Sequence, residues 1–195
     1  MTETGEDYRD ANLSNEVWEQ RTFENCTFVD ADLRGLVTKG CTFDSCDFSR
    51  ADLGESKHSA SAFRSCTFTR TNLMHSAFTG CSLLGSIFHE CRFRPWTVTE
   101  TDLTLVSLAG ANLRRTPLAG LRFREANLTD ADLRESDLQG TDLRGARLLD
   151  TKLADADLRG AQLDANGLKQ AKLAGARVDL EMAVAFAAAH GLHIG

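Results

Sequence analysis

The chain has 195 residues, 42% of them hydrophobic, and its 28 acidic and 22 basic side chains give a net charge of −6 at pH 7. This length allows one or two folded domains. No run approaches the roughly 18 apolar residues of a membrane span, and the N-terminus is acidic rather than signal-like, so we expect a cytoplasmic, soluble protein. The net negative charge also argues against direct binding of nucleic acid, because phosphates would be repelled.

The first segment, residues 1–10, carries four acids and one arginine and has little apolar surface to bury. Such a composition is typical of disordered segments. We therefore predict a flexible acidic N-terminus over residues 1–10.

A strict period of five runs from Leu13 to Val178. Of the 34 positions in this series, 19 are Leu and 10 are Phe, and no insertion shifts the register. An α-helix repeats its buried face every 3.6 residues and a strand every two, so neither accounts for this period. The residue two positions earlier is usually small. The pattern predicts an all-β solenoid over residues 11–178, in which the large and the small residue point inward and stacked coils complete the core.

The exceptions to Leu and Phe predict that the solenoid has four sides. They differ from one another by multiples of 20, so they fall on one side if each coil contains four pentapeptides; they are Trp18, Thr38, His58, Val98 and Val178. Pro95-Trp96 precedes one of them. This irregular side is either a local bulge with other inward groups or a contact surface for a partner, and both interpretations stay open. Phenylalanine dominates the series up to Phe93 and leucine after it, which predicts stacked aromatic rings in the N-terminal half.

The six cysteines all occupy the small inward position; they are Cys26, Cys41, Cys46, Cys66, Cys81 and Cys91. Alanine, serine and threonine share this position, so small size explains the cysteines better than disulfide bonding does. The chain has no CxxC pair, and His89-Glu90-Cys91 has no second pair of ligands nearby. We expect neither a metal nor a cofactor.

Residues 179–195 depart from the repeat and predict a C-terminal α-helix. Asp179 suits an N-cap and Gly191 a helix stop, and the segment between them is rich in alanine. This helix has little polar surface, so we predict that it caps the open end of the solenoid and forms a two-fold homodimer. The predicted dimer interface contains Met182, Val184, Phe186 and Leu192. A cap within a monomer is the alternative.

The segment TDADLRESDLQGTDLRGARL, residues 129–148, shows the repeat most clearly. It resembles the A(D/N)LXX motif of the pentapeptide-repeat family, and the resemblance covers residues 11–178. It implies a right-handed quadrilateral β-helix with four pentapeptides in each coil. With about 4.8 Å between coils, the rod would be roughly 40 Å long, and a dimer through the C-terminal helix roughly 80 Å.

Three stretches outside the motif resemble the mycobacterial MfpA-like group of this family, which is related to the Qnr proteins: residues 61–86, 91–95 and 183–192. This resemblance implies a dimeric DNA mimic that binds DNA gyrase, inhibits supercoiling and lowers fluoroquinolone susceptibility. Qnr proteins carry loops that project from their coils. The unbroken register here matches a smooth rod, so a mechanism that needs those loops does not carry over.

DNA mimicry requires acidic side chains on the surface, and acids are frequent in the C-terminal half of the repeat. We predict an acidic partner-binding surface that includes Asp132, Asp137, Asp142 and Asp157. Grouping the repeats by side gives no obvious acidic stripe. The alternative is that each aspartate pairs with the arginine two residues later, as an exposed ion pair of small energy.

Two other functions remain open on the sequence alone. A scaffold for another protein would use the irregular side, with Trp96 and His58 as its most distinctive residues. An enzyme is disfavoured, because the repeat predicts a filled interior and the five histidines belong to no catalytic motif. The expected function is therefore binding, without catalysis.

Overall fold

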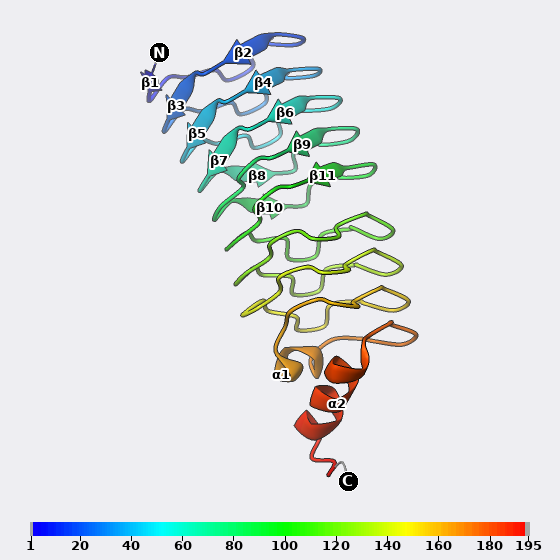
Figure 1. Ribbon diagram of the computed structural model, residues 1–195. Coiled ribbons are helices and arrows are strands. Elements are labelled where there is room, and N and C mark those ends of the chain that lie inside the picture. Colours follow the sequence, from blue (N-terminus) through cyan, green and yellow to red (C-terminus); the bar gives the residue numbers. More distant parts are fainter. Residues whose placement is uncertain (1, 194–195) are drawn as a thin grey trace.

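The computed structural model describes residues 2–193. Its coils stack in a single column, with the N-terminus at one end and the helix α2 at the other (Figure 1). Parallel pairing joins residues that are 20 positions apart, from Thr2↔Thr22 to Asp157↔Arg177. This spacing corresponds to four pentapeptides per coil, and the structure thus confirms the predicted quadrilateral, right-handed β-helix.

Each coil has four sides. We number them 1 to 4 by the inward residues Leu13, Trp18, Phe23 and Phe28, and each later residue lies on the side of the residue 20 positions before it. Regular strands form mainly in the first half of the chain. On side 2 they are β2 (Val17–Glu19), β4 (Val37–Lys39), β6 (Lys57–Ser59), β9 (Ala77–Thr79) and β11 (Thr97–Thr99).

Side 3 carries a second parallel sheet, of β1 (Thr2–Thr4), β3 (Thr22–Glu24), β5 (Thr42–Asp44) and β7 (Ala62–Arg64). Side 4 carries the pair β8 (Thr67–Thr69) and β10 (Ile87–His89). The irregular residues Trp18, Thr38, His58 and Val98 all lie in the side 2 sheet. The prediction that they share one side is confirmed.

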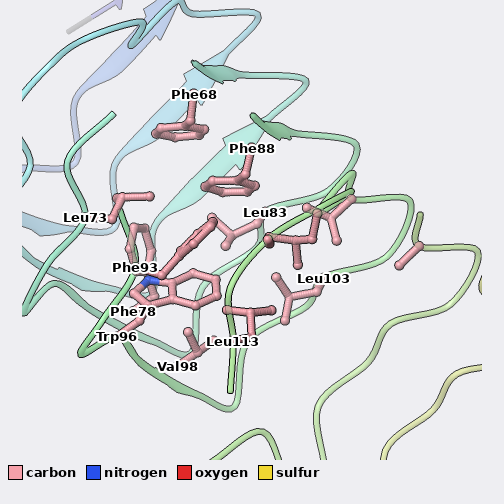
Figure 2. Close-up of a cluster of buried hydrophobic side chains, with 14 of the residues drawn as sticks. Phe68, Leu73, Phe78, Leu83, Phe88, Phe93, Trp96, Val98, Leu103 and Leu113 are labelled. Atoms are coloured by element: carbon pink, nitrogen blue, oxygen red, sulfur yellow. The ribbon is translucent and has the colours of Figure 1, made fainter. Parts of the chain in front are cut away.

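The core is made of the periodic large residues and the small residues two positions before them. Stacked phenylalanine rings run along side 3, where Phe23 and Phe43 lie 5.0 Å apart at an interplanar angle of 3°. A second ladder on side 4 ends with Phe68 and Phe88, whose centroids are 4.6 Å apart (Figure 2). Apart from Phe123 and Val178, leucine fills the periodic positions beyond Val98, as predicted. Because both ladders follow from the 20-residue spacing, the aromatic core is a direct product of the sequence pattern.

At most corners between sides, the second residue after the inward one has a left-handed backbone. Glycine holds some corners, but many others are polar residues with positive φ, such as Asn15 at 59° and Asp130 at 58°. Where the residue before the inward one is Asp or Asn, its side chain helps to hold the turn. The side-chain oxygen accepts a hydrogen bond from the backbone N–H two residues later, as Asp32 does from Arg34. Gly35 leaves no room for a side chain, because a Cβ there would lie 2.5 Å from Asn15 Oδ1.

The N-terminal ten residues differ from the prediction. Residues 2–10 form the first coil: β1 pairs with β3, and Asp7 is bridged to Thr27. Tyr8 holds an inward position and stacks on Phe28, with ring centroids 4.9 Å apart. The expectation of a flexible segment was wrong because the repeat begins earlier, at inward positions occupied by Glu3 and Tyr8 instead of Leu or Phe.

The C-terminal end is closed by two helices, α1 (Ala165–Leu168) and α2 (Leu180–Ala189). Asp179 caps α2 as predicted: its Oδ1 accepts from Met182 N at 2.9 Å, and its Oδ2 accepts from Gly160 N at 3.0 Å. The short α1 was not foreseen, although its last residue, Leu168, keeps the inward register and is buried. Among the described residues, no helix is both long enough and apolar enough to cross a bilayer.

Candidate functional site

The four predicted acids are distributed over three sides of the rod. Asp132 lies on side 1 and Asp142 on side 3. Asp137 and Asp157 lie on side 2 in adjacent coils, where they are bridged to one another in parallel register. The structure therefore brings only two of the four together. Consecutive repeats turn the corner of the rod, so acids five or ten residues apart point in different directions.

Three of these acids are held by the arginine two residues later. Asp132, Asp142 and Asp157 each bind that guanidinium through two oxygens, and in each pair the shorter N–O distance is 2.6 Å. The arginine hydrogen bonds lower the pKa of all three carboxyls, and that of Asp157 falls to about 2. The carboxylates stay charged at neutral pH, but the adjacent cation offsets much of their field. The local ion-pair alternative thus describes these three acids.

Asp137 is the exception, because its neighbour two residues on is Gln139. Asp137 Oδ1 accepts from Gln139 N at 3.0 Å, and the Gln139 side chain reaches across to Asp157 Oδ2 at 3.1 Å. No basic side chain lies within 4 Å of Asp137 among residues 2–193. Of the four predicted acids, Asp137 is the one whose charge is least compensated.

Two further acids join this pair at the neighbouring corner. The four carboxylates of Glu135, Asp137, Asp155 and Asp157 line one shallow hollow of about 300 Å³, together with Arg177. We call these four residues the acidic depression. The sequence contained the signal for it, because Glu135 and Asp155 are 20 residues apart and so stack on adjacent coils. Arg115 and Arg114 bind Glu135 and lower its pKa, whereas Asp155 has no ion pair within the described part of the chain.

The predicted dimer residues, three on α2 and Leu192 just beyond it, divide into two groups. Met182 is buried and Phe186 is half-buried, and both face the last coil, where they line a cavity of about 210 Å³ with Leu168 and Leu173. Val184 and Leu192 remain exposed, at 41% and 62% of their surface. Met182 and Phe186 therefore pack within one chain as part of the cap. Of the four predicted residues, only Val184 and Leu192 are exposed for contact with another copy.

Side 2 also holds a buried polar cluster around His58, which is 2% exposed. The Nδ1 atom of His58 lies 2.8 Å from Thr38 Oγ1, and its Nε2 lies 2.9 Å from Ser56 Oγ. Burial lowers the pKa of His58 to about 3. The imidazole is therefore neutral and satisfied inside the rod, where it has a structural role and no route to solvent.

The cysteines have the structural role that their position predicts. Five of the six are buried, and all six are free thiols. Burial raises the pKa of Cys66, and it raises that of Cys91 to about 11. Residues 2–193 contain no group of three or more side chains arranged to bind a metal ion.

Comparison with known proteins places the fold. Residues 71–148 match the family model of a pentapeptide repeat region, and residues 22–57 and 141–178 match that of pentapeptide repeats. A search of curated protein sequences found no match. Among solved structures, a trypsin-treated variant of QnrB1, a plasmid-mediated fluoroquinolone resistance protein, superposes with a TM-score of 0.86 at 24% identity, covering 100% of this chain and 98% of its own.

Full-length QnrB1 superposes with a TM-score of 0.85 at 24% identity, over 98% of this chain and 97% of its own. HetL from Nostoc sp. strain PCC 7120, a protein involved in heterocyst differentiation regulation, also has 24% identity, over 91% of this chain and 84% of its own, but its TM-score is 0.35. The repeat pattern, the four-sided coil and the family models agree: this chain belongs to the pentapeptide-repeat family.

Proposed function

We propose that this protein binds DNA gyrase in place of duplex DNA, inhibits supercoiling and so lowers fluoroquinolone susceptibility. The observation that carries the proposal is the end-to-end likeness to QnrB1, which is described as a fluoroquinolone resistance protein. The whole rod is shared, including its helical end, with 100% of this chain and 98% of that one superposed. A role for the rod as a whole, in the cytoplasm where gyrase acts, fits this likeness.

Within the Qnr-like group, we place this chain with the smooth rods of the MfpA-like type. The repeat has no insertion between Leu13 and Val178, and every coil keeps its 20-residue length. A smooth surface offers gyrase the sides of the rod and no projecting loop. The binding residues must therefore be sought on the sides and corners.

The acidic depression is the part of the surface best suited to imitate DNA. Duplex DNA carries one charge per about 1.7 Å, which is roughly three charges over the 4.8 Å height of one coil. The acidic depression presents four carboxylates over two adjacent coils. Two of them, Asp137 and Asp155, have no ion pair in the described structure. The electrostatic mimicry that we propose is therefore local, and the rest of the rod contributes shape.

A homodimer through α2 would double this surface. Val184 is exposed on the apolar helix α2 at the end of the rod, and Leu192 is exposed just beyond the end of that helix. A two-fold contact between these helices would bury them and place one acidic depression on either side of the dimer centre. We propose this dimer as the binding form.

The proposal is tested by removing charge without removing hydrogen-bond acceptors. In the Asp137→Asn/Asp155→Asn variant we expect the concentration for half-inhibition of gyrase supercoiling to rise by about tenfold or more. The matched control is Asp44→Asn/Asp47→Asn, which removes two acids near the other end of the rod. Asp47 accepts from Ser49 N at 2.9 Å, the same contact that Asp137 makes with Gln139 N. Equal inhibition by both variants would refute the acidic depression as the contact.

A second candidate function is a scaffold that binds another protein and does not contact gyrase. A specific feature favours it: an arginine-lined groove on a different part of the rod, bounded by Arg94 and Arg115. Its sign of charge is opposite to that of the acidic depression.

A further inference from the structure

In the middle of the rod, the hydrogen-bond ladder that joins successive coils is interrupted along sides 1 and 2. Within residues 2–193, no backbone hydrogen bond joins residues 90–100 to residues 109–120. One coil later the ladder is intact, since Leu113 N donates to Asp132 O at 2.9 Å and Asp132 N donates to Ala111 O at 2.9 Å. On sides 3 and 4 the same two coils stay joined, for example through Phe88 N to Ser107 O. We call this interruption the seam.

The two prolines of the chain explain the seam. Proline has no N–H to donate, and Pro95 and Pro117 lie in the two facing coils. Pro95 takes the corner position, where His75 and Arg115 each donate to the next coil. Pro117 takes the position before the inward Leu118, where a ladder N–H is otherwise found. Both donors are thus missing at the same gap.

Trp96 widens the gap further, because it fills an inward position that is small in most repeats. Its ring is buried against Phe93, Phe78 and Phe88, with the Phe93 centroid at 4.9 Å (Figure 2). The indole Nε1–H has no hydrogen-bond partner in the described structure. The backbone N–H of Trp96 also lacks the turn bond to the preceding inward residue that Ser76 and Thr116 make. The coil at the seam thus leaves a buried polar group unpaired, which stacked coils elsewhere avoid.

The seam opens at the surface as a groove of about 330 Å³, lined by Arg94, Pro95, Trp96, Arg114, Arg115, Thr116 and Pro117. The apolar part of its lining is Pro95, Trp96 and Pro117. The carbonyl oxygens of Arg94 and Arg114 accept no backbone bond, and the outer edge of β11 is unpaired. The groove thus combines an apolar lining with open backbone groups at its rim.

The rim is positively charged. Arg94 has no carboxylate within 4 Å among the described residues, and Arg114 and Arg115 share the single carboxylate of Glu135. Three guanidinium groups therefore face one acid. A ligand that supplies carboxylates would complete these pairs with the strong, forked hydrogen bonds that arginine forms.

We propose that the groove at the seam binds an extended acidic segment of a partner protein. Its carboxylates would pair with Arg94 and Arg115, its apolar side chains would lie on the prolines and Trp96, and its backbone N–H groups would donate to the open carbonyls. The groove accommodates a few residues of a single extended chain. A duplex is the wrong ligand, because the groove is narrow and the chain as a whole carries a net charge of −6. This inference goes beyond the gyrase proposal and concerns a separate surface.

Fluorescence polarisation with a labelled peptide tests the charge complementarity. The probe is a fluorescein-labelled peptide of alternating Glu and Val, about eight residues long, compared with an alternating Lys and Val peptide and a short DNA duplex. We expect the Glu peptide alone to bind, and the Arg94→Glu/Arg115→Glu variant to weaken its affinity by about tenfold or more. Arg34→Glu is the matched control, because Arg34 occupies the same position as Arg94 three coils away. Unchanged affinity in the double variant, or tighter binding of the duplex, would overturn the proposal.

A second variant tests the open seam without a change of charge. Pro95→Gly/Pro117→Thr restores both ladder donors, so the amides of Val98 and Glu100 should gain protection from hydrogen exchange while the groove narrows. We expect peptide affinity to fall by about threefold or more. A closed seam with unchanged affinity would show that the peptide binds elsewhere. Circular dichroism of both double variants confirms that the rod itself is retained.

Discussion

The buried His58 makes the stability of the rod sensitive to mild acid. Ser56 Oγ donates to Leu53 O at 2.7 Å, so this hydroxyl has no proton left for the imidazole and must accept from His58 Nε2–H. His58 Nδ1 then accepts from Thr38. The network is satisfied only by the neutral ring, and burial lowers the pKa of His58 from 6.5 to about 3.

The size of the effect follows from linkage. The unfolded chain takes up a proton near pH 6.5 and the folded chain does not until about pH 3, so the contribution of His58 is fully present above pH 6.5 and lost as the pH falls towards 3. Between about pH 7.5 and pH 5, protonation of the unfolded state lowers the free energy of unfolding by about 2 kcal/mol. The paired carboxylates add little in this window, because their pKa values are lowered.

Urea unfolding of the wild type and of His58→Phe at about pH 7.5 and pH 5 measures this effect. Phenylalanine suits the site, since Phe78 holds the same register in the next coil and lies 4.5 Å from the His58 ring. We expect the wild type to lose about 2 kcal/mol more than the variant on acidification. An equal loss in both proteins would refute the assignment of the pH dependence to His58.

Three further predictions concern other parts of the rod. Gly35→Ala should lower the free energy of unfolding by about 1 to 3 kcal/mol, and by more than Gly80→Ala does. Both glycines have positive φ, but only at Gly35 would the new Cβ lie within 3 Å of a side chain. Thermal denaturation of the two variants measures the difference. In the native protein at about pH 8, a thiol reagent should leave the cysteines unlabelled for minutes and should react with all six in urea, since even the half-buried Cys91 has a pKa of about 11; rapid native labelling would contradict the burial. Val184→Glu/Leu192→Glu should shift sedimentation from dimer to monomer, and an unchanged dimer would place the interface elsewhere.

The architecture could be predicted from the sequence because the same five-residue repeat determines both the local conformation and the stacking of the coils. A period of five sets the side, and the exceptions at multiples of 20 set the number of sides. The N-terminal coil escaped prediction because its inward Glu3 does not look like a core residue. The structure shows how it is accommodated: Arg21 Nη2 binds Glu3 Oε1 at 2.6 Å, and the Tyr8 hydroxyl donates to the same carboxylate.

The acidic surface was predicted less well than the fold, for a geometric reason. Asp132, Asp137 and Asp142 are five residues apart, and that spacing carries each one around a corner of the rod. Acids at the same position of the repeat share a side when they are 20 residues apart, as Asp137 and Asp157 are. The motif itself predicted the ion pairs between aspartate and the arginine two residues later. Only the fold shows where the acids without such a partner lie together.

The seam could not be found from sequence patterns, although both prolines are visible there. Pro95 and Pro117 are 22 residues apart, in different positions of their repeats. Their common effect on one gap emerges only when the two coils are stacked. The irregular side was noted as a bulge or a partner contact, and in the structure it borders the seam.

Supercoiling of relaxed plasmid by DNA gyrase, with ATP, tests the central claim most directly. Purified protein is titrated into the reaction, and its binding to the plasmid alone is measured in parallel by gel shift. We expect supercoiling to be inhibited at protein concentrations that leave the plasmid unbound. Full supercoiling in the presence of excess protein would contradict it, and the arginine-lined groove would then be the first surface to pursue.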